Sequence, residues 1–525
     1  MMTSGQYILG IDIGTSSAKT GLWLDTGSGL KLAAEATSFY TLHRPQPTWA
    51  EIDARLWWNA ACATIREVMA KAGISGRDIA GVGVDGLGWA LVPVDASGEP
   101  LCPAMIWLDR RAEAEAIELQ AMPEAARLID LVANPLDPAY ITPKLRWLQR
   151  HQPDVFKATA KFLTCSGYIV QQLTGEFTCD YTQAYGFHCF DIRRERWDEA
   201  AAAALGIPLE TLPALHPSVG LVGGVTAAAA AATGLASGTP VIAGCLDAAV
   251  GAFGCGVARV GQTSDQGGQA FGLSLCVDQV MVEPRLIFSH HVVPGLYLLQ
   301  GGTVGGGMLG WFRDTLGQPE AMAAKLLNAS PYELMSQQAA STPAGAHGLI
   351  FLPYMAGERS PLWNSDARGV FFGLSYNTTR ADMLRAIMEG CAFAVYHNML
   401  LAEETGGHVS EWIGIGGASR SPVWCQIKAD ITNRPFTVAR RTDGGSGDNS
   451  LGLAIMVQRA LGVHDDMAAQ IEAALPERQT FTPSPERHAL YRELFEIYLS
   501  LSVKLEPDFA HLAAAVERHS QFLKG

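Results

Sequence analysis

Tyr7–Ser38 reads YILGIDIGTSSAKTGLWLDTGSGLKLAAEATS, and this stretch decides the fold class. Its first apolar run, Tyr7–Ile13, stops at the polar turn Gly14–Ser17. A second run, Gly21–Leu24, stops at the sequence DTGSG, and a third, Leu30–Ser38, follows. Short apolar runs bounded by Gly, Ser, Thr and Asp are typical of strands joined by tight turns. The stretch therefore predicts three consecutive strands.

Helical and strand patterns alternate after this stretch. Residues Asp53–Ala72 place apolar side chains along one side of a helix. Ile79–Val84 and Ala90–Val94 are apolar runs of strand length. Strands that alternate with helices predict an α/β architecture.

The pattern of the first residues returns near residue 250. A strand at Val241–Ala243 and a helix start at Ala248–Phe253 lead to a strand at Val260–Ser264. The turn Gln266-Gly267-Gly268 and the strand Ala270–Val277 follow. We therefore expect two domains built on one plan, 1–254 and 255–525. Further elements are expected at Arg380–Leu401, Trp412–Ile415, Pro422–Thr432, Ser450–Leu461 and His488–Leu505, and the tract Ala227–Ala232 is expected to be helical.

The composition excludes some classes of partner. The net charge is −14, which argues against nucleic acid or an anionic membrane as partner. The ten cysteines are scattered without a C-x-x-C pair, as expected in a reducing compartment. Neither a secretory signal nor an apolar run of about 18 residues is visible, so the cytoplasm is the expected location.

Two aspartates follow strands at positions suited to chemistry. Asp12 opens the turn Asp12-Ile13-Gly14-Thr15-Ser16, where glycine, hydroxyls and amides suit a phosphate and the carboxylate suits a hydrated metal ion. The alternative is that these residues form an ordinary hairpin turn without a binding function. Asp247 stands between a strand and a helix, where one carboxylate can act as a base in phosphoryl transfer. A helix-capping role is the alternative for Asp247.

A third glycine-rich turn, Gly414–Ser419, follows a strand and precedes a helix. Glycines at such a place let the backbone approach a purine or ribose. The turn lacks the Gly-Lys-Ser/Thr ending of a Walker motif and the full G-x-G-x-x-G spacing of a dinucleotide site. By itself it only suggests a nucleotide.

Taken in order, these pieces resemble the FGGY family of carbohydrate kinases over nearly the whole chain. Gly369–Leu374, followed after seven residues by Asp382–Glu389, is similar to the family's C-terminal signature, and Gly357–Pro361 just before it is typical of the family. Lys144–Trp147 resembles the core of the N-terminal signature, although Ile141 stands where a small or hydroxyl residue is usual. Within the family, the stretches Trp107–Arg111 and Phe351–Tyr354 are most similar to xylulokinases.

The resemblance implies two actin-like (ribonuclease H-like) ATPase domains around a central cleft, with Mg-ATP as donor and a small sugar or polyol as acceptor. It implies Asp247 as catalytic base and Asp12 as the carboxylate near Mg²⁺. The implied nucleotide-binding residues are Gly14, Thr15, Ser16, Gln266, Gly267, Gly268, Gly306, Gly310, Gly416, Gly417 and Ser421. The implied sugar-binding residues are Gly88, Trp89, Trp107, Asp109 and Asp247. The resemblance also suggests a homodimer.

Two departures from the family pattern bear on activity. Gln266-Gly267-Gly268 stands where Gly-Thr-Ser is usual, so one hydroxyl donor to the terminal phosphate is missing. Asp265 and Gln269 are the neighbours that could compensate. Leu87-Gly88-Trp89 stands where xylulokinases carry Gln-Met-His, so an indole replaces a histidine. This change leaves the acceptor open between xylulose, another ketopentose, a deoxy sugar and a less polar analogue.

The leading hypothesis is an active kinase for a ketopentose-like sugar. A degenerate kinase that binds sugar or nucleotide with little turnover is the alternative, and the Gln266-Gly267-Gly268 turn favours it. A third class, an actin- or chaperone-like ATPase that acts on proteins, is disfavoured by the C-terminal signature.

Overall fold

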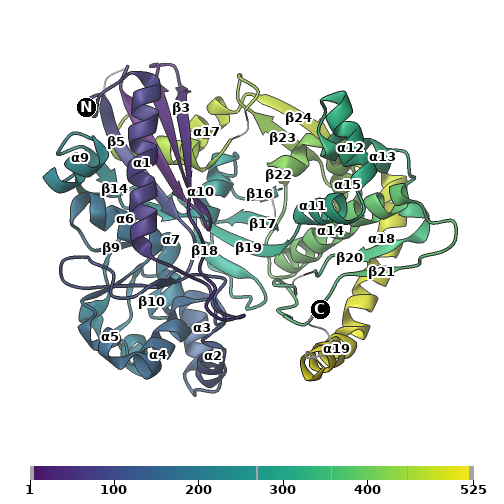
Figure 1. Ribbon diagram of the computed structural model, residues 1–525, viewed down its shortest axis with the longest axis horizontal. Helices are drawn as coiled ribbons and strands as arrows, with labels where there is room; N and C mark the ends of the chain where they lie inside the picture. Colours follow the sequence, from purple (N-terminus) through teal and green to yellow (C-terminus); the bar gives the residue numbers. More distant parts are fainter. Residues whose placement is uncertain are drawn as a thin grey trace. The chain divides into compact units, whose positions relative to one another are not determined.

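The computed structural model describes residues 5–519 other than 266, 268, 269, 356, 415 and 446. The chain forms two compact units (Figure 1). Unit 1 comprises residues 1–260, 276–298 and 447–476, and unit 2 comprises residues 261–275, 299–446 and 477–525. This division differs from the expected single boundary at residue 254, because two later segments, 276–298 and 447–476, belong to unit 1.

The three predicted strands belong to the seven-stranded sheet of unit 1. They are β1 (Tyr7–Ile13), β2 (Ser17–Asp25) and β3 (Leu30–Phe39), and each pairs antiparallel with the next. On its other side β1 pairs parallel with β5 (Ile79–Gly86). The sheet order is β13-β14-β5-β1-β2-β3, with β15 beside β5. The remaining strands of this sheet are β13 (Leu221–Gly224), β14 (Pro240–Ile242) and β15 (Cys245–Leu246).

Helices cover both faces of this sheet. Helix α1 (Ala54–Ala72) packs on β2 and β3 and lies along the sheet in Figure 1. Its Asp53 cap accepts a hydrogen bond from the Arg55 amide, and Gly73 ends it in a left-handed conformation, as helix ends require. Alternate side chains of β1 and β5 form the core with α1, and the side chains between them face α16 (Asn449–Ala460).

Glycines let α16 lie close to the sheet. Gly10 and Gly83 are paired neighbours on β1 and β5. A Cβ on Gly10 would lie 2.6 Å from the Ser450 carbonyl oxygen. Since α16 stands so close, its first residues lie at the ends of β1 and β5, where the candidate site is found.

Unit 2 repeats the strand-turn-strand opening. Strands β16 (Gln262–Asp265) and β17 (Ala270–Val277) pair antiparallel, and β16 pairs parallel with β22 (Glu411–Gly414). The order runs β19-β17-β16-β22-β23-β24. The other strands of this run are β19 (Tyr297–Val304), β23 (Phe436–Arg440) and β24 (Glu477–Phe481).

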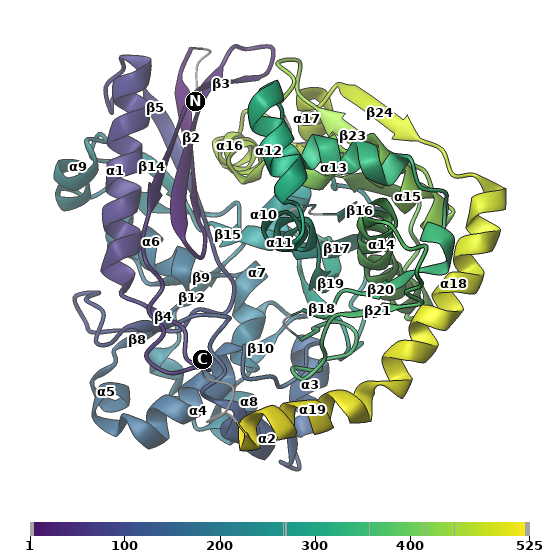
Figure 2. The ribbon, with the colours of Figure 1, turned by 45° about the vertical axis from the view of Figure 1, so that its right-hand side comes forward.

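Long helices pack around this second sheet. Helix α14 (Arg380–Glu404) contacts α15 (Pro422–Thr432), and α15 contacts α18 (Pro485–Lys504). In Figure 2 α18 and α19 (Glu506–Arg518) follow one another in yellow at the C-terminal end. Thr379 and Asp382 form a reciprocal capping box at the start of α14.

The other elements connect or flank these two sheets. In unit 1 they are β4 (Glu51–Ile52), β6 (Val92–Val94), β7 (Ala104–Met105), α2 (Glu113–Gln120), α3 (Ala125–Val132), α4 (Ile141–His151), α5 (Pro153–Ala158), β8 (Lys161–Leu163), α6 (Cys165–Thr174), β9 (Thr178–Asp180), α7 (Tyr181–Ala184), β10 (Phe190–Asp191), β11 (Arg196–Trp197), α8 (Glu199–Leu205), β12 (Ala214–His216), α9 (Ala227–Thr233), α10 (Asp247–Gly254), β18 (Ile287–His290) and α17 (Met467–Ala474). In unit 2 they are α11 (Gly307–Thr315), α12 (Gln318–Leu327), α13 (Pro331–Ala340), β20 (Ile350–Leu352) and β21 (Val370–Phe372). Short 3₁₀ turns occur at 185–187, 209–211, 346–348 and 417–420.

The α/β prediction is confirmed, and most elements lie where the sequence placed them. The strand expected at Ala90–Val94 begins only at Val92, because Trp89 adopts a left-handed conformation with φ of 54°. The strand expected at Val260–Ser264 is displaced to Gln262–Asp265. Among the helices of the described part of the chain, none is long and apolar enough to cross a bilayer.

Candidate active site

A row of paired residues crosses the sheet of unit 1 near the ends of its strands. Lys19 on β2 pairs with Asp12 on β1, and Asp12 pairs with Asp85 on β5. Asp85 in turn pairs with Cys245 on β15. Neighbouring strands lie about 4.8 Å apart and paired side chains share a face, so these side chains are neighbours. The row brings a lysine and two carboxyls together on the face covered by α16.

Burial distinguishes the two carboxyls of this row. Asp12 is partly exposed, whereas Asp85 has no exposed surface. Burial raises the pKa of Asp12, and the charge of Lys19 opposes that rise. Burial raises the pKa of Asp85 well above its usual range, and the nearby charges of Asp12 and Asp247 raise it further. Asp12, which the sequence predicts to lie near a metal ion, thus has another acidic side chain, Asp85, beside it.

Asp247 begins α10, directly after β15. Its Oδ1 accepts a hydrogen bond of 2.6 Å from the Ala248 amide, and its backbone oxygen accepts one of 3.4 Å from the Asn449 amide group. The side chain is half-buried. Burial, followed by the charge of Asp12, raises the pKa of Asp247 to about 7. A carboxyl with a pKa near neutrality can act as a general base.

The predicted phosphate turn Gly14-Thr15-Ser16 joins β1 to β2 at the same end of the sheet. The Gly14 amide donates to the Ser17 carbonyl oxygen over 3.0 Å, which closes a tight hairpin. Ser16 is exposed, and Thr15 is half-buried. The Thr15 hydroxyl accepts a hydrogen bond of 3.2 Å from the Trp107 indole. Trp107, which is predicted to bind the sugar, is therefore hydrogen-bonded to Thr15, which is predicted to bind phosphate.

Trp89 lies in a cluster of aromatic rings. Its ring stacks on Tyr140 with centroids 4.2 Å apart and meets the edge of Tyr185 at 6.3 Å. One face of the indole is thus already covered by protein. The indole N–H and the Tyr185 hydroxyl lie near each other, yet neither forms a hydrogen bond of normal geometry with any described residue. The N–H, more than the ring face, is the part of Trp89 that could serve a sugar.

Lys144 fixes the backbone of Trp89. Its Nζ donates to the carbonyl oxygens of Trp89 and Ala139 over 2.8 and 2.7 Å. Lys144 is fully buried, and burial lowers its pKa to about 7. Left-handed backbone is uncommon for a bulky residue, so a buried donor on the adjacent carbonyl stabilises it. Gly88, the other predicted residue of this loop, would meet Leu246 at 2.9 Å if it carried a Cβ.

The Asp109 carboxylate is bonded to other protein groups. It is fully buried and accepts a hydrogen bond of 2.6 Å from the Ala50 amide. Both of its oxygens also contact the Arg111 guanidinium, which continues to Glu51 over 2.7 Å. Its assignment to sugar binding stays a prediction, and the contacts present hold the loop that carries Trp107.

In unit 2 two of the predicted nucleotide turns lie together. The Gly267 carbonyl oxygen accepts a hydrogen bond of 3.0 Å from the Ala418 amide. Gly416 has φ of 76° and ψ of −166°, a backbone conformation open to glycine. Gly416 and Gly417 are exposed, so backbone is accessible there to a ligand. Gln266 and Gly268, also predicted at this site, lie outside the described residues.

Asp265 does not supply the missing phosphate donor. Its carboxylate forms a buried ion pair with Lys428 and accepts the Gly267 amide at 3.3 Å. A paired carboxylate donates no hydrogen bond to an anion. Lys428 also lies over the Phe271 ring, with its nitrogen 4.3 Å from the centroid. The ion pair anchors the turn, and Gln269, the other candidate, is outside the described residues.

The remaining predicted nucleotide residues stand at helix starts. Gly306 precedes α11, and Gly310 lies within its first turns, half-buried. Ser421 caps α15 by accepting the Trp424 amide at 3.3 Å, and its hydroxyl is 2.5 Å from that of Ser336. Unpaired amides at helix starts suit anionic groups.

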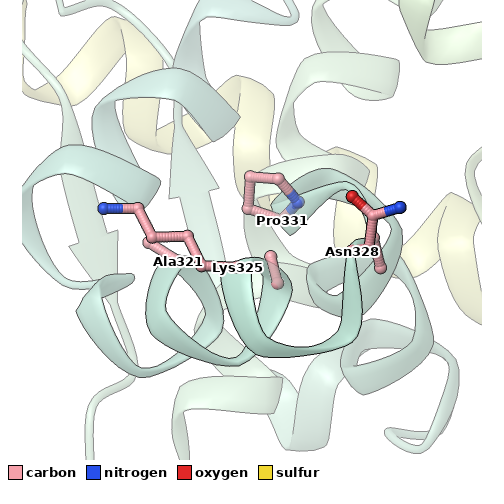
Figure 3. A pocket seen from close by; sticks show the side chains of 6 residues that line it. Ala321, Lys325, Asn328 and Pro331 are labelled. Carbon is pink, nitrogen blue, oxygen red and sulfur yellow. The ribbon is translucent and has the colours of Figure 1, made fainter.

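A surface pocket lies elsewhere in unit 2. Its volume is about 310 Å³, and it lies at the junction of α12 and α13 (Figure 3). The lining residues are Ala321, Ala324, Lys325, Asn328, Ala329 and Pro331. None of these residues belongs to the predicted site.

Comparison with known proteins decides the family. Residues 7–254 match the N-terminal domain of the FGGY family of carbohydrate kinases, and residues 280–460 match its C-terminal domain. This chain belongs to the FGGY family of carbohydrate kinases. It is a carbohydrate kinase that phosphorylates a sugar with ATP as donor.

Individual relatives of this FGGY kinase align over nearly its whole length. The xylulose kinase of Escherichia coli (strain K12) is 30% identical over 503 residues, covering 95% of this chain and 99% of that protein. A gluconokinase of Bacillus licheniformis is 27% identical over 515 residues, covering 98% of each. The crystal structure of xylulose kinase from Rhodospirillum rubrum is 32% identical, with a TM-score of 0.85, and covers 96% of this chain and all of that one.

The C-terminal signature of this FGGY kinase has a structural role. Glu389 on α14 accepts hydrogen bonds from Arg385 Nε at 2.8 Å and from the Tyr491 hydroxyl at 2.6 Å. It also accepts the Gly345 amide at 3.0 Å. Asp382, at the other end of the signature, caps the same helix. The signature therefore joins α14 to α18 and to the loop before β20.

The residues of unit 1 fit a magnesium ion. Mg²⁺ is usually held by one or two carboxylates together with waters and substrate phosphates. Asp12 and Asp85 offer hard oxygen donors, and Asp85 presents both oxygens without a hydrogen bond of normal geometry to any described residue. Among the described residues no group of three or more His, Cys, Asp or Glu side chains could hold a metal ion alone. The two carboxylates therefore suit a magnesium ion whose remaining ligands come from a bound phosphate group and water.

Sequence reasoning missed three side chains of this FGGY kinase's candidate site. Asp85 had a visible signal, because it is the acidic residue in the apolar strand IAGVGVDG. Lys428 had the same kind of signal in the helix PVWCQIKADIT. Tyr185 had none, since its place beside Trp89 depends on a contact between distant parts of the chain.

Proposed function

We propose that this protein transfers the terminal phosphoryl group of ATP to a hydroxyl of a ketopentose-like sugar such as xylulose. The observation that carries the proposal is Asp247, a half-buried carboxyl directly after the short strand β15, with a pKa near 7. The similarity to xylulose kinases over nearly the whole chain supports the substrate class.

The proposed chemistry needs one base and fixed positions. The acceptor hydroxyl oxygen attacks the γ-phosphorus, its proton passes to the Asp247 carboxylate, and the bond from the γ-phosphorus to the bridging oxygen of ADP breaks. Bound Mg²⁺ supplies charge neutralisation for the phosphate oxygens. Asp12 is proposed to hold that ion, and the Gly14–Ser16 turn to donate hydrogen bonds to phosphate.

The remaining residues are proposed to position the two substrates. Trp107 and the N–H of Trp89 would contact the sugar. Gly417 and Ser421 would contact the nucleoside. The degenerate-kinase alternative is not favoured, since the Asp12 and Asp247 carboxyls needed for turnover are both present.

Release of ADP from Mg-ATP tests the proposal. The acceptors are xylulose, other ketopentoses, ketohexoses, polyols and gluconate, the last because gluconokinases are among the relatives. We expect one ketopentose to stimulate release, and Asp247→Ala to abolish that stimulation. Asp53→Asn is the control, because asparagine replaces aspartate well at the cap of α1.

Two outcomes would contradict the proposal. If gluconate alone stimulated ADP release, the acceptor would be a sugar acid and not a ketopentose. Stimulation that survives in Asp247→Ala would remove Asp247 from the role of base.

A further inference from the structure

Asp85 is a buried carboxyl that its surroundings compensate poorly, because Asn449 alone favours its ionised form while the charges of Asp12 and Asp247 oppose it. Its side chain has no exposed surface, and neither oxygen forms a hydrogen bond of normal geometry with any residue in the described part of the chain. Transfer of an ionised carboxylate out of water costs several kcal/mol unless a charge or donors replace the water. An aliphatic residue would serve a buried strand better.

The charged groups that act on Asp85 are acidic. Asp12 is its partner on one side, and Asp247 follows the strand on its other side. The one lysine of the row, Lys19, is paired with Asp12 and stands a strand farther away. Three carboxyls, that of Asp85 included, are therefore gathered here, with a single lysine at a distance.

The direction of the Asp85 side chain is set by the sheet. Val82 and Val84 belong to the core with α1, so Gly83 and Asp85 face α16. Asp12 faces the same way, since Leu9, Ile11 and Ile13 face α1. Asn449, the first residue of α16, lies beside Asp85 and donates to the backbone oxygen of Asp247. Asp85 thus points among Asp12, Asp247 and the start of α16.

We propose that Asp85 is a second carboxylate ligand, beside Asp12, of the divalent cation that accompanies the nucleotide. A hard cation would compensate a carboxyl whose two buried oxygens lack a hydrogen bond of normal geometry to any described residue, and its other ligands would be waters and phosphate oxygens. The inference rests on the proposed function in that it concerns the same nucleotide-bound ion.

Cation binding by Asp85→Asn tests this inference without a turnover assay. Mn²⁺ in the presence of ADP is the probe, and free Mn²⁺ is followed by electron paramagnetic resonance. We expect Asp85→Asn to weaken Mn²⁺ binding at least tenfold, because an amide oxygen carries no net charge. Without cation, the variant should melt at the same temperature as the wild type or higher, since it removes a poorly compensated buried carboxyl.

Asp25→Asn is the matched control. Asp25 is a buried aspartate of the same sheet, but it is bonded to Gln458 at 2.9 Å and lies at the opposite end of β2 from Lys19. This control should bind Mn²⁺ like the wild type. Asp85→Ser is a second variant of the site, in case the amide is poorly accommodated, and it should show the same weakening.

Wild-type Mn²⁺ affinity in a folded Asp85→Asn or Asp85→Ser protein would overturn the inference. A cation-free Asp85→Asn protein that melts well below the wild type would overturn it too, because the carboxyl would then be stabilising the fold. Failure of the proposed function looks different: no sugar would be phosphorylated, while Mn²⁺ binding would still depend on Asp85.

Discussion

Among single residues, Asp247 has the clearest dependence on pH. Burial and the charge of Asp12 raise its pKa to about 7, and a base must be ionised to accept a proton. We predict that kcat/KM for the sugar, at Mg-ATP concentrations well below KM, falls about tenfold per pH unit below that value and levels off above it. Initial rates between pH 5.5 and 8.5 measure this.

The Asp247→Asn variant provides the comparison for this profile. Its residual rate should lack the acidic limb, because the titrating group is gone. A wild-type kcat/KM that stays flat down to pH 5.5 would show that the Asp247 pKa is not raised in the working enzyme.

Lys144 gives a second prediction at the scale of the residue. Lys144→Met keeps the length of the side chain but leaves the Trp89 and Ala139 carbonyl oxygens without their donor. We expect a loss of about 1–3 kcal/mol per carbonyl in the free energy of unfolding, and a raised KM for the sugar through movement of Trp89. Urea unfolding and steady-state kinetics measure the two effects.

Lys161→Met is the matched control for Lys144. Lys161 also donates to two carbonyl oxygens, those of Glu210 and Leu212, but it is half-buried, so water can replace its amine. Its substitution should cost much less stability and leave KM unchanged. Equal losses from both variants would show that burial of Lys144 is not what matters.

Among the elements, the packing of α16 on the sheet is set by two paired glycines. A Cβ on Gly10 would lie 2.6 Å from the Ser450 carbonyl oxygen, whereas one on Gly83 would meet only side-chain atoms of Leu453 and Val457, at 3.2 Å or more. Backbone cannot move aside as a side chain can. We predict that Gly10→Ala destabilises unit 1 by about 1–3 kcal/mol and Gly83→Ala by less.

Urea midpoints of the two alanine variants measure this difference. The two positions share a register pair and a helix, so the comparison isolates the backbone contact. A Gly83→Ala protein less stable than Gly10→Ala would contradict the packing described for α16.

The sequence predicted elements better than it predicted the site's interior. Strands β1 and β17 and helix α15 have the predicted bounds, because Gly, Asn, Asp and Pro mark their ends. The turns at Asp12 and Asp247 were also predicted, since chemistry-bearing residues followed apolar runs. Asp85 was missed although its strand was found, because a strand pattern does not tell which neighbours a buried carboxyl will have.

At the scale of the whole molecule, local sequence patterns could not predict which segments of the chain make up unit 1. Helix α16 was predicted as Ser450–Leu461, almost its observed range, yet nothing in those residues states that they pack on β1. The packing of α16 on the sheet joins residues more than four hundred positions apart, for example Trp23 of β2 and Ser450, whose side chains are 3.1 Å apart.

A protein truncated after residue 254 tests the importance of this contact. Such a protein lacks α16, whose buried residues include Leu451, Leu453, Ile455 and Val457. We predict that it is insoluble or binds hydrophobic dyes, because one face of the sheet is left uncovered. Adding residues 276–298 and 447–476 through flexible linkers should restore solubility, and a soluble, cooperatively unfolding 1–254 protein would contradict the prediction.

The three-segment composition of unit 1 also has a consequence for synthesis. Most of its sheet has left the ribosome by residue 260, but the segment that covers one face ends at residue 476. At about 5–20 residues per second, the intervening chain takes roughly 10–40 s to make. During that time the nascent sheet exposes an apolar surface, and we expect the growing chain to be a client of ribosome-associated chaperones until α16 emerges.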